Sequence, residues 1–552
     1  MGKRKRVRKI QNNYPAEDLV IPAVILMIIL LTSWTWAVIV SQNGLQGSAY
    51  FFTVFDLILI LMGSVPYTLK SVIASLVNKR VEQKQYRNAK SILNAGLLIA
   101  ILYSIAVILL LCIFADSLSQ SVLIGPKSYL TLIILTCTIL CYSISCTFKG
   151  YFEGMGGSFP LLAASLTGQL VMAIAAAVFS GIFMNQGIKA ANVLGTQETR
   201  YAYGAAGAAV GVFIGILAVC ILILFLYQLY GKYFRKLLKR DTAKRRTDTV
   251  DIVIHLLMQV FPMAGSYFVV LLYPVIDQII FFRTGELLGK TIMLTYQWGA
   301  YAGIYRGVLF LPLLIVLTLT ATEKRKLSIG YHSGDIHEVR IKIHGIIRDN
   351  MIVSLFFMAL ALVMADKIIT GFFLVESALA VRLLRMGCIA MVLLAMSVTL
   401  LVILPAINMS LASLLTGICA LAANGITAYI AVERLSMGIY GIMLSVIVFG
   451  AVYTLLGMFF LHQAVKGRMN IRKILYFPVA SIMITMVVMI LLSLLFGLFL
   501  PPIINVIVTA LLSFLIYFIA LAKFEVISVY SVSAFPFGSL LLRLGKLLGI
   551  FP

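Results

Sequence analysis

The sequence predicts an all-α membrane protein of about fourteen spanning helices, arranged as two lobes of six helices followed by two more helices. Three observations predict this class. Long apolar runs fill the chain, hydrophobic residues make up 62% of it with a mean hydropathy of +1.05, and Lys and Arg lie mainly in alternate gaps between the runs. Runs of 18 or more apolar residues can cross a hydrocarbon core of about 30 Å, and lipid requires a helix because it offers the backbone no hydrogen-bond partner.

Each apolar run is taken as one span. In chain order the predicted spans are 19–40, 47–72, 91–114, 128–149, 158–184, 204–230, 252–280, 293–320, 347–366, 384–406, 409–431, 439–462, 474–499 and 502–522. The predicted organisation is a basic tail (1–18), an N-terminal lobe (19–230), a linker (231–250), a C-terminal lobe (251–462), two additional helices (463–522) and a cytoplasmic tail (523–552).

The distribution of basic residues predicts the orientation. With a cytoplasmic N-terminus, 34 of the 44 Lys and Arg residues fall on the cytoplasmic side, nine fall outside, and Arg306 alone lies within a span. Such an asymmetry sets topology, so both termini are expected to be cytoplasmic, in the cell membrane. The net charge of +24 is spread over short loops next to the membrane. Its expected partner is therefore the anionic lipid of the inner leaflet, and not nucleic acid.

Two further patterns concern organisation. The segments NKRVEQKQYRNAKSIL after the second span and EKRKLSIGYHSGDIHEVRIKI after the eighth are alike. They favour parallel repeats around a central cavity, although two cytoplasmic loops can also look alike because both obey the positive-inside rule. Near the C-terminus, leucines share one stripe of a predicted interfacial helix, for which a disordered end is the alternative. They are Leu540, Leu541, Leu544, Leu547 and Leu548.

Arg306 is the leading candidate for a binding residue. A central Arg costs roughly 2.5–3.5 kcal/mol on insertion scales, so it normally faces a cavity or a partner. Gly299, Gly303 and Gly307 recur every fourth residue on the same side of this span. They favour an open groove in which the guanidinium captures a phosphate in a bidentate manner. The alternative is a seam of close helix packing, with Arg306 satisfied by an acid.

Asp56, Gly63 and Lys70 are seven residues apart in the second span and are expected to share a face. Asp56 is interpreted as the counter-ion of Arg306 or as a carboxylate that couples transport to a cation. A carboxylate hydrogen-bonded to neighbouring helices is the alternative. The predicted substrate-binding set is therefore Arg306, Asp56, Lys70, Gly303 and Gly307.

The remaining polar residues predict neither a catalytic site nor a metal or cofactor site. An interfacial pair is expected for Asp277 and Arg283, and a local ion pair for Lys149 and Glu153. The seven cysteines lie in predicted spans without CxxC spacing, and the five histidines are scattered. We therefore expect no metal site, no cofactor and no catalytic residue. No nucleotide-binding motif is present, so transport would be driven by an ion or cargo gradient or by the membrane potential.

Several segments resemble a known superfamily, the multidrug/oligosaccharidyl-lipid/polysaccharide (MOP) exporters. The resembling stretches are LQGSAYFF…GSVPYTLKSVIASLVNKRVEQKQYRNAKSIL (45–93), KGYFEGMGGSFPLLAASLTGQLV (149–171), YAYGAAGAAVGVFIGIL (201–217) and GIYRGVLFLPLLIVLTLTAT (303–322). The similar branch contains stage V sporulation protein B and MurJ-like lipid II flippases. The resemblance implies a V-shaped bundle of fourteen helices, MATE- or MurJ-like, around a cationic cavity. It also implies outward movement of an undecaprenyl-pyrophosphate-linked saccharide by alternating access.

Two departures concern the cargo. Residues 19–40 contain no Arg or Lys, whereas lipid II flippases carry arginines in the first span, and the Pro common at the end of the eighth span is missing. Both departures concern lipid II in particular. The resemblance still implies a flippase and not an enzyme. Its cargo would be lipid II or another polysaccharide precursor, and its transport would be coupled to H⁺ or Na⁺. The first alternative is a cation-coupled drug or metabolite antiporter. A remoter alternative is an integral-membrane glycosyltransferase or polymerase, but the outer gaps are short and poor in carboxylates.

Overall fold

The computed structural model describes residues 17–196, 198–241, 248–286, 291–465, 472–527 and 538–547, and the regular elements in these ranges are all helices. The N-terminal part contains α2 (Glu17–Gly63), α3 (Val65–Glu82), α4 (Tyr86–Ile113), α5 (Ala115–Ser121), α6 (Tyr129–Thr136), α7 (Thr138–Gly154), α8 (Ser158–Leu194), α9 (Glu198–Leu229) and α10 (Gly231–Lys239). A short 3₁₀ turn, η1 (Pro126–Ser128), precedes α6.

The C-terminal part is equally helical. It contains α11 (Thr249–Glu286), α12 (Thr291–Gly299), α13 (Arg306–His332), α14 (Ile336–Ile368), α15 (Ala378–Gly387), α16 (Ile389–Ala406), α17 (Ser410–Tyr429), α18 (Ile439–Val465), α19 (Phe477–Gly497), α20 (Pro502–Lys523) and α22 (Gly538–Leu547). Four π-helical turns adjoin them: η2 (Ala300–Tyr305), η3 (Ile369–Phe373), η4 (Ile430–Arg434) and η5 (Arg472–Tyr476).

Helix α2 is a hairpin of two spans and not one long rod. Sixteen residues separate Trp36 from Phe52, which would place them about 24 Å apart along a straight helix. Their ring centroids are only 4.3 Å apart and the rings are stacked. The chain reverses at Gly44, the one residue of α2 with non-helical backbone angles (φ 65°, ψ −177°). A positive φ is accessible to Gly at little cost, which explains so tight a reversal.

This hairpin reconciles the number of spans. Thirteen helical segments in the described residues are long and apolar enough to cross a membrane, and the first, Val20–Glu82, contains both limbs of the hairpin. The prediction of about fourteen spanning helices is therefore confirmed, and the chain is a multi-pass integral membrane protein. Several helices are longer than their predicted spans. Helix α8 continues to Leu194, ten residues past the predicted end, because polar residues end a hydropathy run without ending a helix.

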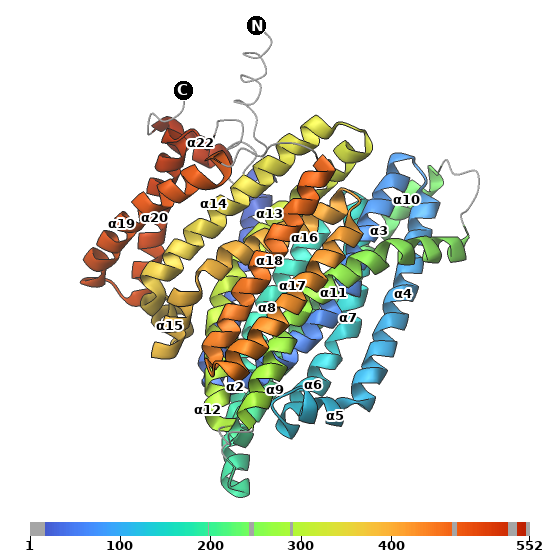
Figure 1. Ribbon diagram of the computed structural model, residues 1–552. Helices are drawn as coiled ribbons and strands as arrows, with labels where there is room; N and C mark the ends of the chain where they lie inside the picture. The colour runs from blue at the N-terminus through green and yellow to red at the C-terminus, as the bar shows by residue number, and fades with distance from the viewer. Residues whose placement is uncertain are drawn as a thin grey trace.

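The helices pack in pairs within each part. In the N-terminal part α8 packs on α9 and α3 packs on α7, and in the C-terminal part α11 packs on α17 and α13 packs on α16. Helices α19 and α20 pack against each other and against α14, at one flank of the bundle (Figure 1). The two parts meet where α2 contacts α11, α12 and α13 and where α3 and α4 contact α11.

Four connections between spans end in the same backbone motif, two in each part. A residue with positive φ follows the helix (Lys84, Gly156, Gly334 and Asn408). The next N–H then reaches back five residues to a carbonyl oxygen: Gln85 to Arg80, Gly157 to Phe152, Asp335 to Gly330 and Met409 to Leu404. This is the Schellman ending of a helix. It recurs after spans two and four of each part and also ends α20 at Glu525, so the parallel repeat remains a prediction.

Figure 1 shows α10 and the connections at 83–85 and 333–335 at one end of the bundle, which we call the basic end. The α8–α9 connection and α5 lie at the other, which we call the opposite end. The predicted linker 231–250 thus includes helix α10, and the predicted C-terminal helix is present as α22. The basic tail up to residue 16 and Leu548 lie outside the described residues.

Candidate functional site

An ion pair between Asp56 and Arg306 joins the two parts in the interior of the bundle. Asp56 lies in the second limb of α2, about 18 Å along the helix from the reversal at Gly44, and Arg306 is the first residue of α13. Arg306 Nη1 lies 2.5 Å from Asp56 Oδ2, and Nη2 lies 2.7 Å from Oδ1. The Asp56 side chain is 1% exposed and the Arg306 side chain 12%. The prediction that Asp56 is the counter-ion of Arg306 is therefore confirmed.

The geometry of this pair is the bidentate fork that gives arginine its specificity for carboxylates and phosphates. Both carboxylate oxygens of Asp56 are engaged, so the arginine charge is compensated where burial would otherwise make it costly. Each partner belongs to a different half of the chain. Separating the halves at this point therefore exposes a guanidinium on one side and a carboxylate on the other.

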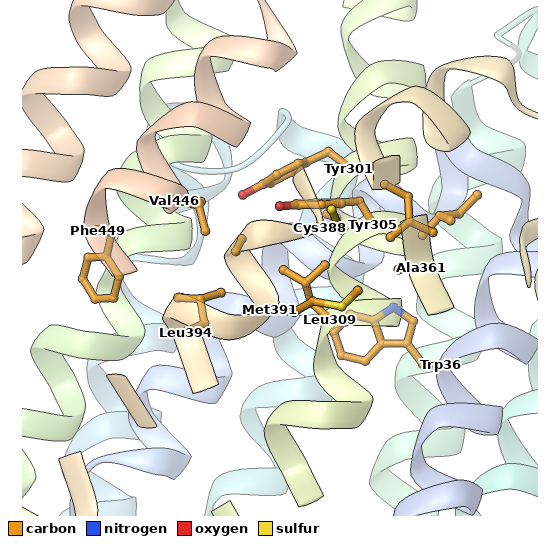
Figure 2. Close-up of a cluster of buried hydrophobic side chains, with 14 of the residues drawn as sticks. Trp36, Tyr301, Tyr305, Leu309, Ala361, Cys388, Met391, Leu394, Val446 and Phe449 are labelled. Carbon is orange, nitrogen blue, oxygen red and sulfur yellow. The ribbon is translucent and has the colours of Figure 1, made fainter. Parts of the chain in front are cut away.

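A π-helical turn and a tryptophan position Arg306. The turn η2 immediately precedes Arg306, and such turns interrupt the regular helical hydrogen bonds, often at functional sites. Trp36 Nε1 donates a hydrogen bond to the Gly303 carbonyl oxygen at 2.7 Å. The indole is stacked on Phe52 and lies beside Leu309 in Figure 2. Sequence reasoning missed Trp36, because nothing in an apolar span marks one aromatic residue as a contact between lobes.

The two tyrosines of η2 are buried on the other side of this turn. The Tyr301 and Tyr305 rings are stacked with centroids 5.5 Å apart, and Figure 2 shows their hydroxyl groups pointing in the same direction. Tyr305 donates to the Gly387 carbonyl oxygen at 3.0 Å. The Tyr301 hydroxyl has no hydrogen-bond partner among the described residues. The segment before Arg306 is thus aromatic and closely packed.

The glycines of this helix line a packing seam and not an open groove, which corrects the favoured interpretation of Gly303 and Gly307. A methyl group added at Gly307 would lie 2.7 Å from Trp36 Nε1, and one at Gly303 would lie 3.1 Å from Val40 and 3.2 Å from Ser48. One added at Gly299 would overlap the Leu45 carbonyl oxygen. In this conformation the glycines let two helix backbones approach closely.

Lys70 forms an ion pair of its own and not with Asp56 or Arg306, and the helix face that it was predicted to share with Asp56 remains a prediction. The helix is interrupted at Ser64, between α2 and α3, and Pro66 follows in the first turn of α3. The spacing of seven residues therefore does not run along one continuous helix. Lys70 Nζ lies 3.1 Å from Glu153 of α7. Glu153 is thus paired across helices, and the predicted pair with Lys149 does not form among the described residues.

A second buried acid, Asp277 of α11, lies in the C-terminal part. It is completely buried, and Ser445 Oγ of α18 donates to Oδ1 at 3.1 Å. Its Oδ2 has no hydrogen-bond partner among the described residues. The predicted interfacial pair with Arg283 is therefore wrong. Asp277 lies nine residues before the end of α11, and its side chain contacts α18 inside the lobe. Spacing along the sequence does not show which neighbouring helix a side chain contacts.

The surroundings of Asp277 are polar. Asn424 of α17 interacts electrostatically with the carboxylate, as does the more distant Arg306. Asn424 is also completely buried, and its side chain lies beside this carboxylate. A buried carboxylate with polar side chains of two other helices beside it is the second candidate for a functional group in the bundle. Within the described residues no group of three His, Cys, Asp or Glu side chains could hold a metal ion.

Comparison with known proteins identifies the fold. No family model matches the chain. Stage V sporulation protein B of Bacillus subtilis (strain 168) is 24% identical over 285 residues, which are 51% of this chain and 52% of that protein. The chain thus matches about half the length of this curated relative.

Solved structures extend the comparison over most of the chain. An inward-facing multidrug resistance MATE family transporter of the MOP superfamily aligns with a TM-score of 0.57, and an outward-facing one with 0.59. Both are 16% identical, and the alignments cover 80–81% of this chain and 94–95% of theirs. A MATE in complex with MaL6 aligns with a TM-score of 0.61. The predicted MATE-like fold and the predicted resemblance to the MOP superfamily are therefore confirmed.

Proposed function

We propose that this chain, which has the fold of MOP-superfamily transporters, is a secondary transporter for an undecaprenyl-pyrophosphate-linked saccharide. The cargo would be lipid II or another polysaccharide precursor, moved outward by alternating access between the two lobes. The observation that supports this most is the bidentate contact of Arg306 and Asp56 across the lobes. The similarity to stage V sporulation protein B supports the same branch.

The chemistry of the proposed site is an exchange of anions on one guanidinium. With the lobes together, Asp56 occupies both terminal nitrogens of Arg306. A pyrophosphate presents oxygen atoms in a similar arrangement and carries more charge, so it can displace the carboxylate when the lobes part. Return of Asp56 then helps to release the cargo. Asp56→Asn should therefore bind cargo more tightly and release it more slowly.

Asp277 is the proposed site of ion coupling. A fully buried carboxylate without a compensating partner is unfavourable as an anion. Binding of H⁺, or of Na⁺ through the oxygens of Asp277, Asn424 and Ser445, would neutralise it. Because its charge also acts on Arg306, neutralising Asp277 would leave the guanidinium less compensated and tighten its hold on anions. Asp277→Asn should abolish the dependence of transport on an ion gradient, while movement of cargo down its own gradient persists.

A drug or metabolite antiporter is the second candidate function. It is favoured by Asp277 and Asn424, because a buried acid in a polar pocket suits an organic cation. It is also favoured by the similarity of the fold to multidrug resistance MATE family transporters. In this case Asp277 would bind the cargo, and Arg306 would serve only to hold the lobes together.

Reconstitution distinguishes the two candidates. Proteoliposomes containing wild type, Arg306→Ala or Arg306→Lys would be assayed for translocation of a fluorescent undecaprenyl-pyrophosphate saccharide and, separately, for exchange of an organic cation. The proposal expects saccharide translocation by wild type, almost none by Arg306→Ala, and partial recovery by Arg306→Lys, because lysine keeps the charge but not the planar fork. Cation exchange without saccharide translocation, or full translocation by correctly folded Arg306→Ala, would contradict it.

A further inference from the structure

A cavity of about 350 Å³ lies at the basic end, between the first two turns of α4 and the end of α10. Its lining residues are Arg87, Lys90, Ser91, Asn94, Leu238 and Lys239. Three of these six are basic, and none is acidic. The cavity is remote from Arg306, and the transport mechanism proposed above does not use it.

Both walls of the cavity are held in place. On α10, Phe234 is buried among aromatic rings, with Tyr151 at 5.6 Å and Tyr227 at 5.5 Å between centroids. On α4, the Arg87 N–H donates to Asp241 Oδ2 at 2.6 Å. Asp241 therefore already occupies the start of α4 and ties it to the residues that follow α10, so the cavity does not depend on the helix N-terminus to attract an anion.

The cavity carries an excess of positive charge. Asp241 is the acid at this site, and its carboxylate lies 3.9 Å from Arg87 Nε. Lys90 and Lys239 form no ion pair with any residue that the structure describes. Ser91 and Asn94 add polar groups on the same face of α4. An anion that accepts hydrogen bonds, such as a phosphate, complements this lining.

The position along α4 indicates that this phosphate belongs to a lipid. The helix has 28 residues and is about 42 Å long, so it exceeds a hydrocarbon core of about 30 Å by roughly two turns. Those two turns line the cavity. Directly along the same face follow Leu98, Ile101, Leu102 and Ile105, which are 38–58% exposed. An acyl chain on this stripe would leave its head group in the cavity.

We propose that the cavity between α4 and α10 binds the phosphate head group of an anionic phospholipid of the leaflet at the basic end, with one acyl chain along α4. Lys90 and Lys239 contact the phosphate, and Ser91 and Asn94 contact its ester or glycerol oxygens. The bound lipid would fasten the start of the linker between the lobes to the N-terminal lobe. The site is independent of the cargo site.

Lipid binding to the purified full-length protein tests this directly. Dioleoyl phosphatidylglycerol would be titrated into protein in a neutral detergent, and the bound lipid measured by native mass spectrometry. Lys90→Gln with Lys239→Gln should weaken binding about 30-fold, since each basic residue contributes about one factor of five to six. The matched control is Lys79→Gln with Lys232→Gln, which removes the same charge from two exposed lysines outside the cavity lining and should leave binding close to wild type.

A second variant keeps every charge. Asn94→Trp fills the cavity and should also prevent binding, and it serves if the double lysine variant does not fold. Equal weakening by both charge pairs, or wild-type binding by Asn94→Trp, would overturn the proposal in favour of diffuse attraction. Displacement of the lipid by equimolar glycerol phosphate would overturn the lipid assignment and indicate a site for soluble phosphates. None of these outcomes depends on transport, so they are separate from the test of the proposed function.

Discussion

The two halves of the contact between the lobes are built differently. Toward the opposite end, Gly299, Gly303 and Gly307 bring the α12–η2–α13 segment against the backbone and Trp36 of α2. Toward the basic end, α13 meets α3 through long side chains, while α11 packs on α3 and α4 through apolar residues. Lys324 Nζ lies 2.7 Å from Ser71 Oγ, and Arg325 Nη2 lies 3.0 Å from Glu82 Oε1, with both partners of the second pair 61% exposed.

This difference predicts unequal resistance to opening. Close-packed backbones have many dispersion contacts and cannot separate slightly without losing them. Exposed ion pairs contribute only about 0–1 kcal/mol and are replaced by water. The contact between α13 and α3 should therefore open at lower cost than the glycine seam. The Asp56–Arg306 pair lies between the two halves, so it must break whichever end opens.

In the first test a cysteine is either labelled or not labelled, and the result establishes which compartment each end of the bundle faces. After the native cysteines are replaced, Arg240→Cys beside α10 should not react with an impermeant maleimide in intact cells, because the basic residues predict a cytoplasmic position. Val193→Cys at the opposite end, where Val193 is 85% exposed, should react and serves as the control. Labelling at position 240 in intact cells would reverse the two ends.

The largest energetic effect is expected at the junction. Arg306→Gln leaves the buried Asp56 carboxylate without a partner and should destabilise the protein by about 3–5 kcal/mol. The double variant with Asp56→Asn removes both charges, so its destabilisation should be smaller than the sum of the single variants by about 0.5–3 kcal/mol. Unfolding in detergent and translocation rates would both be measured. Strict additivity would mean that the two residues act separately.

A smaller effect, about 1–3 kcal/mol from overpacking, is expected at the glycine seam. Gly299→Leu should prevent the close approach to Leu45, stop transport and raise the labelling of Ser48→Cys from the opposite end. Gly345→Leu is the matched control, because a side chain there meets nothing within 4 Å. Normal transport by Gly299→Leu would show that this seam does not need to close.

The smallest effect is expected at the basic end. Removing the exposed pair with Arg325→Ala or Glu82→Ala should change stability by at most about 1 kcal/mol. The change should also diminish in high salt, which screens exposed charges. The measurement is the unfolding midpoint at low and high salt. A loss as large as that of Gly299→Leu would contradict the proposed difference between the halves.

Several features of the candidate site were predictable from sequence. An arginine within a span needs an acid or an anion nearby, and few acids lie at mid-membrane, so charge made Asp56 a candidate partner of Arg306 and the structure selected it among the alternatives. Asp277 was assigned wrongly because proximity in sequence favoured Arg283 as its partner. Its actual neighbours, Ser445 and Asn424, come from two distant helices, and no local pattern connects them.

The sequence by itself determined the membrane class and the approximately fourteen spans, and it marked Arg306 and Asp56 as charges within them, because hydropathy and the cost of a buried charge are properties of individual segments. Only the tertiary structure decided which side of each helix is covered. The interruption at Ser64 separates Lys70 from Asp56, and the hairpin of α2 places Trp36 and Leu45 against the glycines that sequence spacing had assigned to a groove. An open groove and a packing seam require the same small residues, so the choice between them depends on what another helix places opposite.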